Sequence, residues 1–167
     1  MTLTKSNGVV QKKIGANTLG AVLILTVLCL SSCRALPPIQ KVDLAGPGWN
    51  VRQGQAIWRP NRNAPEIAGD LIVATHPDLH AFVQFSKSPM TLAVAVKTRD
   101  SWQAEFPFAN KHYSGRGKPP ARLTWLLLAA TLSGASPPPP WMWHESNGNW
   151  RLENMKTGES LAGYLSP

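Results

Sequence analysis

Cysteine is scarce in this 167-residue sequence, which contains only Cys29 and Cys33. Because both precede Arg34, the rest of the chain cannot form a disulfide bond within itself. The chain beyond Cys33 is long enough for one domain, in which roughly two thirds of the surface can be buried on folding. We therefore expect the fold to be stabilised by an apolar core alone.

Catalytic and metal-binding motifs are also missing. The sequence has no G-x-S-x-G, no H-E-x-x-H, no paired metal-ligand spacing and no phosphate-binding glycine loop. His76 and His80 are four residues apart, but the intervening Pro77-Asp78 indicates a turn, which disfavours a shared metal. His112 and His144 have no acidic or cysteine partner nearby in the sequence. We predict that the protein is not an enzyme and uses no cofactor or metal.

A dense run of positive charge, as found in nucleic-acid-binding segments, is absent as well. Lys5, Lys12 and Lys13 contribute three of the formal net charge of +8, which leaves +5 after Cys33. These remaining basic residues are scattered among acidic ones. The glycine-rich basic segment Gly115–Lys118 is interpreted as a loop leading into a helix and not as a phosphate-binding motif. The charge favours solubility or contact with anionic lipid headgroups, and no nucleic-acid partner is expected.

The amino-terminal segment has the pattern of a secretory signal. The run 19–30 contains no charged residue and follows a basic segment without acids. A membrane-spanning helix needs about 20 apolar residues, and this run is shorter. Leu30-Ser31-Ser32-Cys33 closes the run and resembles the lipobox of bacterial lipoproteins, in which the cysteine becomes acylated and forms the new amino terminus.

The lipobox resemblance implies that Cys33 is lipidated and anchors the protein to a membrane. Arg34 follows it instead of the aspartate that retains such lipoproteins in the inner membrane, which implies the outer membrane and a periplasmic face. An ordinary cleaved signal and a short uncleaved anchor remain as alternatives. We expect a signal peptide at 1–32, the lipidated cysteine and a proline-containing tether at 33–47, and one β-rich domain at 48–167.

Alternation of apolar and polar residues predicts strands through most of this domain. The predicted strands are 49–58, 67–75, 81–86, 91–98, 102–108, 141–145, 150–153 and 161–165. Asn147-Gly148 between two of them is the strongest hairpin signal in the chain. Frequent turns favour an antiparallel meander, and the last three strands are expected to form a ribbon.

One principal helix is predicted at 119–132, with a proline in its first turn and Ser133-Gly134 at its end. Apolar residues nearly encircle this helix, which indicates burial against a curved sheet. The four prolines at 137–140 are expected to form a stiff extended linker. The predicted fold class is mainly β, an antiparallel meander curved into an incomplete β-barrel packed around the helix.

Seven tryptophans are the remaining distinctive feature, and all follow Cys33. Most are expected in the core, because each indole buries a large area. Trp58, Trp141 and Trp143 lie near strand ends beside prolines, where they could instead contact lipid headgroups or line the mouth of a cavity.

Four features together resemble the LolA/LolB superfamily of lipoprotein carriers, and LolB in particular. They are the apolar helix, the proline-rich turn, the final tryptophan hairpin, and the strand that contains Trp49, Val51, Arg52, Gly54 and Ala56. The resemblance covers most of 48–165. It implies an incomplete β-barrel covered by helices, whose apolar cavity binds the acyl chains of lipoproteins. The chain is shorter than typical LolB proteins and has one clear helix where their lid has more.

On this resemblance, apolar residues of the inner face would form the lipid-binding site. They are Ile57, Leu71, Val73, Val83, Phe85, Leu92, Val94, Val96, Trp102, Phe106, Leu123, Leu126 and Leu127. Two functions remain open. The protein is either a carrier or receptor with a cavity for acyl chains or other lipid, or a non-catalytic structural lipoprotein with a solid core and an envelope protein as its partner.

Overall fold

The computed structural model describes residues 39–166, most of which form β-strands, and the predicted leader, Cys33 and Arg34 lie outside this range. The elements are β1 (Asn50–Arg59), β2 (Ile67–Thr75), β3 (Ala81–Lys87), β4 (Met90–Lys97), β5 (Ser101–Phe106), the 3-10 turn η1 (Pro107–Ala109), β6 (Lys111–Arg116), α2 (Thr124–Leu132), β7 (Trp141–Ser146), β8 (Asn149–Asn154) and β9 (Ser160–Ser166). The eight predicted strands are confirmed to within one or two residues at their ends. β6 was not predicted.

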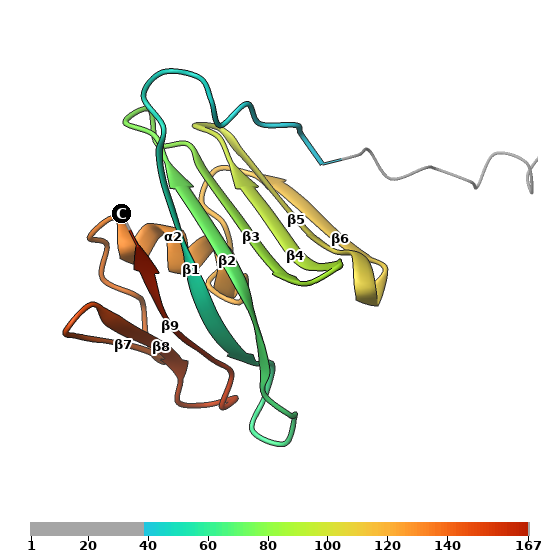
Figure 1. Cartoon of the computed structure of the whole chain (residues 1–167), viewed down its shortest axis with the longest axis vertical. Helices are drawn as coiled ribbons and strands as arrows, with labels where there is room; N and C mark the ends of the chain where they lie inside the picture. Colours follow the sequence, from blue (N-terminus) through green and yellow to red (C-terminus); the bar gives the residue numbers. More distant parts are fainter. Residues whose placement is uncertain (1–38, 167) are drawn as a thin grey trace, which may run out of the picture. The chain divides into compact units, whose positions relative to one another are not determined.

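All nine strands belong to one antiparallel sheet with the order β6-β5-β4-β3-β2-β1-β9-β8-β7 (Figure 1). The first six strands form a meander, after which the chain crosses through α2 to the opposite edge and returns by β8 and β9 to β1. β6 and β7 are the two edges and do not pair with each other, so the sheet is open and not closed into a barrel. A mainly β, antiparallel fold with one α-helix is therefore confirmed for the part of the chain from 39 to 166.

The β7–β8 hairpin confirms the predicted turn. Asn147 and Gly148 both have positive φ angles, 52° and 76°, as a two-residue type I′ turn requires. The stacked rings of Trp143 and Trp150 lie 6.0 Å apart across the hairpin. This turn and stacking fix the register in which Trp141 pairs with Asn154.

α2 begins at Thr124, later than the predicted start at residue 119. The Leu123 N–H donates to the Pro120 carbonyl at 2.9 Å, so the two prolines belong to a turn that precedes the helix. The predicted end at Leu132 is confirmed, because Gly134 follows with a φ of +94° that most other residues disfavour. The helix packs against one face of β2, β3 and β4.

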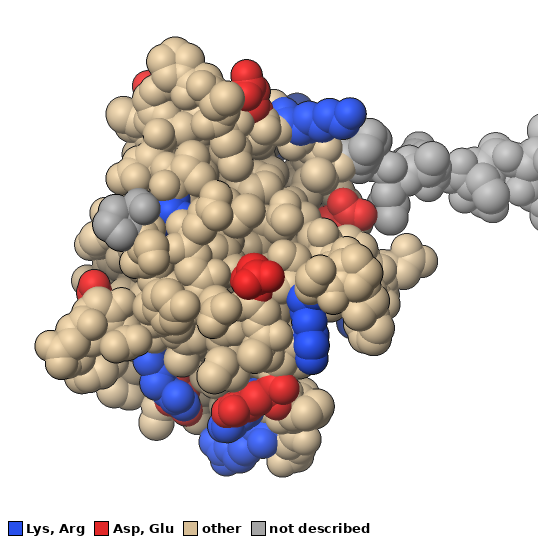
Figure 2. All heavy atoms as spheres, in the orientation of Figure 1, with Lys and Arg blue, Asp and Glu red and all other residues tan. Residues whose placement is uncertain are grey.

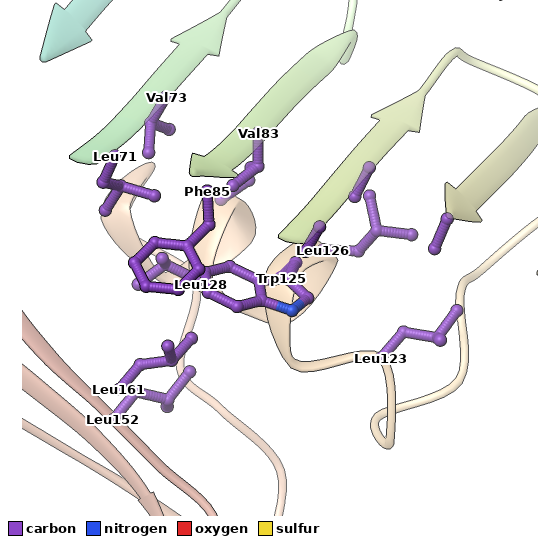
Figure 3. Close-up of a cluster of buried hydrophobic side chains, with 14 of the residues drawn as sticks. Leu71, Val73, Val83, Phe85, Leu123, Trp125, Leu126, Leu128, Leu152 and Leu161 are labelled. Atoms are coloured by element: carbon purple, nitrogen blue, oxygen red, sulfur yellow. The ribbon is translucent and has the colours of Figure 1, made fainter. Parts of the chain in front are cut away.

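The core lies between α2 and this inner face of the sheet, and Figure 3 shows its centre. Phe85 on β3 stacks on Trp125 of the helix, with ring centroids 5.0 Å apart. Leu152 and Leu161 extend the same core onto β8 and β9. Every member of the core cluster comes from the segment 56–161, so the domain has a complete core of its own.

Two glycines allow β1 and β9 to approach closely in the middle of the sheet. A Cβ atom on Gly163 would lie 2.2 Å from the Gln55 carbonyl oxygen, and one on Gly54 would lie 2.0 Å from the Tyr164 carbonyl oxygen. Because Cβ atoms do not tolerate such distances, only glycine fits at either position. These two residues bring the carboxyl-terminal ribbon against the meander.

The segment that precedes β1 runs along the end of the sheet. The Gln40 N–H donates to Oε1 of Gln103 on β5 at 2.8 Å, and the Pro47 carbonyl lies 3.3 Å from Nε2 of His76. Val42 and Leu44 in this segment are half-buried. The segment predicted as a tether up to residue 47 is thus part of the folded domain from at least Gln40 onward.

Candidate functional site: an aromatic pocket beside the helix

A pocket of about 400 Å³ opens where the sheet passes the first turn of α2. Aromatic and aliphatic side chains make up much of its wall, together with one carboxyl group. The residues that matter for its chemistry are Trp58, Phe106, Tyr113, Leu123, Trp125 and Glu159. Its size lies within the range of about 300–1,000 Å³ that small-molecule sites occupy.

The strand register explains why these side chains meet. In β6, Tyr113 pairs with Ala104, and Lys111 pairs with Phe106, so all four residues lie on the inner face. Trp58 lies on the same inner face of β1, opposite Leu161 of β9. Since α2 makes its main contacts with β2 to β4, Phe106 at the end of β5 and Tyr113 of β6 are left to line an opening.

Four aromatic rings form a continuous wall of the pocket. The ring centroid of Trp58 lies 5.5 Å from that of Trp125, in an edge-to-face arrangement, and 6.5 Å from that of Phe106. Phe106 in turn meets Tyr113 edge to face at 6.1 Å. Such a wall offers apolar surface with few rotatable bonds, which suits binding of an apolar group at a low cost in side-chain entropy.

The indole N–H of Trp125 is buried and has no hydrogen-bond partner among the described residues. In Figure 3 its nitrogen lies at the end of the indole away from Phe85. A buried donor without a partner costs about 1–3 kcal/mol, and the indole N–H groups of Trp102 and Trp150 are in the same situation.

Glu159, just before β9, is the polar group of this pocket. Its Oε1 accepts hydrogen bonds from the Thr124 hydroxyl at 2.5 Å and from the Trp58 indole N–H at 3.4 Å. Burial raises the pKa of the Glu159 carboxyl above its usual value, and these two hydrogen bonds oppose part of that rise. The carboxyl group therefore holds the Trp58 ring and the first turn of α2 in place.

Two basic side chains border the pocket, Lys111 from β6 and Arg122 from the loop before α2, and both residues are exposed. A ligand with an apolar tail among the aromatic rings could place an anionic or ester group near them. The Thr124 hydroxyl and the Glu159 carboxyl group form a hydrogen-bonded polar pair within this otherwise largely apolar lining.

The predicted lipid-binding residues divide into several groups. Leu71, Val73, Val83 and Phe85 are completely buried beneath α2, where they pack against Leu126. Leu92 and Trp102 are also members of this core. Phe106 and Leu123 line the aromatic pocket, and Leu127 joins Leu126 at a separate apolar recess of about 200 Å³.

Three predicted residues lie on the opposite face of the sheet. Ile57 is 44% exposed and is flanked on the inner face by Ala56 and Trp58. Val94 and Val96 point away from α2, because Ala93 and Ala95 pair with the inward Phe85 and Val83. The expectation that these three residues face inward is therefore corrected. The small alanines of β4 allow the helix to pack close to the sheet.

This opposite face has a larger hollow of about 630 Å³ over β9, β1 and β2. Its lining includes the small residues Ala68, Gly69, Ala162 and Gly163 as well as Asp70, Lys87, Trp150 and Tyr164. Figure 2 shows the same face with few charged side chains in its central part. Trp150 and Tyr164 are the two aromatic residues of the hollow, whereas four aromatic rings in mutual contact form the wall of the aromatic pocket.

Sequence reasoning identified Trp58 as a candidate for the mouth of a cavity but missed Tyr113, Trp125 and Glu159. Nothing in the pattern around Gly158-Glu159 indicates that this carboxyl group is buried. Among residues 39–166, no group of three or more His, Cys, Asp or Glu side chains has an arrangement suited to a metal ion. In the same range, no helix has the length and apolar character that crossing a bilayer would require.

Comparison with known proteins adds no family assignment. No protein-family model matches the sequence, and no curated protein matches it.

Proposed function

We propose that this protein is a non-catalytic lipoprotein of the bacterial outer membrane, anchored by acylated Cys33 and facing the periplasm. Its domain binds one acyl chain, or a lipid with a similar apolar part, in the aromatic pocket, in the manner of a LolB-like carrier or receptor. The observation that carries this proposal is the pocket of about 400 Å³ with a wall of four aromatic rings beside α2.

The filled core limits how much lipid the domain can bind. Leu71, Val83 and Phe85 fill the space beneath α2, where a larger carrier cavity would have to lie. Binding is therefore confined to the margin beyond the helix, between Trp58 and Tyr113. A capacity of one chain rather than several follows from this geometry.

The anchor is tested by replacing Cys33 with Ser. The parent protein is expected to incorporate labelled palmitate and to fractionate with the outer membrane, and the Cys33→Ser variant is expected to lose both properties. Continued membrane attachment of the variant, without palmitate in the parent protein, would contradict the anchor and favour an uncleaved apolar leader.

Lipid binding is tested with the domain from Arg34 to Pro167, because its core is complete without the leader. We expect lipid to co-purify in native mass spectrometry and a fluorescent fatty acid to bind with a stoichiometry of one. Tyr113→Ala, which opens the pocket wall, should weaken binding several-fold. Tyr164→Ala is the matched control, since Tyr164 is similarly exposed but lies on the other face of the sheet.

A second function, as a structural lipoprotein that binds an envelope protein, is favoured by the same filled core. A domain that purifies without lipid and ignores the fluorescent fatty acid would support this alternative. An equal response of Tyr113→Ala and Tyr164→Ala would likewise count against the aromatic pocket as the lipid site.

A further inference from the structure

The edge of the sheet formed by β6 and the turn before it has a composition unlike the rest of the domain. Between Phe106 and Arg122 the sequence contains four basic residues and no acidic residue. The four are Lys111, Arg116, Lys118 and Arg122, and all of them are exposed. This segment, Phe106–Arg122, is called the basic edge below.

The basic edge also presents an aromatic side chain to solvent. Phe108 is 80% exposed, which is the largest exposed fraction of any large hydrophobic residue among residues 39–166. It lies within the turn η1, which Pro107 begins and Asn110 ends in a left-handed conformation with a φ of 49°. An aromatic ring held outward on a short turn beside basic residues is typical of surfaces that contact the interface of a bilayer.

The chain enters the domain next to this edge. Gln40 is hydrogen-bonded to Gln103 of β5, the strand that pairs with β6, and Figure 1 shows the first described residues on that side of the sheet. Gln40 is the seventh residue after Cys33, a span of at most about 25 Å. Phe108 is the fifth residue after Gln103, a span of at most about 18 Å. A bilayer that holds Cys33 is thus within reach of the basic edge.

Protection of an exposed strand against pairing with other chains would explain the lysine and arginine residues of β6. It does not explain Phe108, because an exposed aromatic ring promotes association instead of preventing it. The opposite edge, β7, carries Glu145 and contains neither Lys nor Arg, so of the two edges only the one beside the entry of the chain carries Lys and Arg.

We propose that the basic edge is a docking surface for an anionic lipid bilayer, in which Phe108 inserts among the headgroups while Lys111, Arg116 and Lys118 contact lipid phosphates. The placement of this edge toward the anchoring membrane rests on the proposed acylation of Cys33. The affinity of the surface for lipid does not, because it depends only on groups within the domain.

The first experiment measures binding of the unlipidated domain, Arg34 to Pro167, to vesicles. We expect it to sediment with vesicles of phosphatidylglycerol and phosphatidylcholine in equal parts, and not with vesicles of phosphatidylcholine alone. Lys111→Ala with Arg116→Ala should weaken binding by about five-fold for each basic residue removed. Phe108→Ala should weaken it on the order of ten-fold.

Matched control variants separate the surface from general charge and apolarity. Arg151→Ala with Lys156→Ala removes the same charge from β8 and the turn after it, and Met142→Ala removes an exposed apolar side chain from β7. Both controls are expected to bind vesicles as the parent domain does. Equal losses in the controls and in the basic-edge variants would overturn the proposal, and so would an absence of vesicle binding.

The second experiment uses the lipidated protein in vesicles, with a fluorophore at Phe108→Cys or, as a control, at Met142→Cys. A quencher confined to the lipid phase should quench the label at 108 strongly and the label at 142 weakly. Equal quenching would overturn the proposed orientation. If Cys33 proves not to be acylated, binding of the isolated domain to vesicles still supports the basic edge as a docking surface. If Cys33 is acylated but the isolated domain does not bind vesicles, the anchor stands and the docking surface is disproved.

A second copy of the chain is the competing occupant of this edge. Association of the domain into dimers that Phe108→Ala abolishes, without any binding to vesicles, would assign the basic edge to contact between copies and overturn the proposal.

Discussion

The Thr124 hydroxyl donates a hydrogen bond of 2.5 Å to the Glu159 carboxyl group and joins the segment before β9 to the first turn of α2. The residue before the helix, Leu123, has no side chain that could cap it. Glu159 therefore places a carboxyl group from a distant part of the chain beside the first turn of α2, where the helix dipole favours negative charge. Its position also orients Trp58, so one carboxyl group organises both the helix start and the aromatic pocket.

The raised pKa of Glu159 predicts a specific pH dependence of stability. An acid whose pKa is higher in the folded than in the unfolded protein binds more protons when folded, so the free energy of unfolding falls as pH rises from the usual carboxyl pKa through the raised value. Glu159→Gln keeps an oxygen acceptor for Thr124 and cannot ionise. Denaturant unfolding over this pH range should show that the free energy of unfolding of the variant does not fall with rising pH in this way.

Glu145→Gln, at an exposed position on β7, is the control for that measurement and should leave the slope in place. Parallel pH profiles for the parent protein and Glu159→Gln would show that the carboxyl group is not responsible.

Loss of the Thr124 hydroxyl should destabilise the domain. Thr124→Val keeps the shape of the side chain but leaves the buried Glu159 oxygen without its shorter hydrogen bond, at a cost of about 1–3 kcal/mol in the free energy of unfolding. Thr124→Ser retains the hydroxyl and should recover most of that loss. Equal stability of the Val and Ser variants in urea unfolding would argue against a role for the hydrogen bond.

Two phenylalanines should respond very differently to truncation. Phe85 is completely buried against Trp125, so Phe85→Ala is expected to lower the free energy of unfolding by about 3–5 kcal/mol. Phe108 is exposed, and Phe108→Ala should change the free energy of unfolding by no more than about 0.5 kcal/mol. Thermal or urea unfolding measures both. A large loss at Phe108 would mean that its ring packs within the domain.

The close approach of β1 and β9 predicts that Gly163 tolerates no side chain. Gly163→Ala places a methyl group against the Gln55 carbonyl and should cost more than about 2 kcal/mol, as overpacking typically does at its upper range. Gly46→Ala is the control, because a Cβ there comes no closer than 3.4 Å to its neighbours. Hydrogen exchange should show the damage at the β1–β9 pairing, and normal protection there would refute the prediction.

Much of this fold could be predicted from the sequence because most strands have one buried face. The run 67–75 is rich in apolar residues and stops at the turn signal His76-Pro77-Asp78, which agrees with the observed bounds of β2. Asn147-Gly148 identified the β7–β8 turn through its requirement for positive φ. β6 was missed because Lys111–Arg116 forms an edge in which most residues are exposed and no apolar alternation is needed.

The candidate site was harder to predict, since it depends on which face each residue occupies and on contacts between distant segments. Ile57 and Trp58 are adjacent and both apolar, so composition alone could not decide which of them faces the core. Val94 and Val96 of β4 were predicted as inward-facing residues because they are larger and more apolar than alanine. The helix instead packs over the smaller Ala93 and Ala95. Glu159 becomes buried only because Thr124 and Trp58 meet it in the folded domain.

The position of β1 in the middle of the sheet has a consequence for the order of folding. Its neighbour on one side, β2, follows directly along the chain, but its neighbour on the other side is β9, the last of the strands described in residues 39–166. Pairing across about a hundred intervening residues is entropically slow. The two halves of the sheet therefore join only when β9 pairs with β1, which makes this pairing a late event in folding.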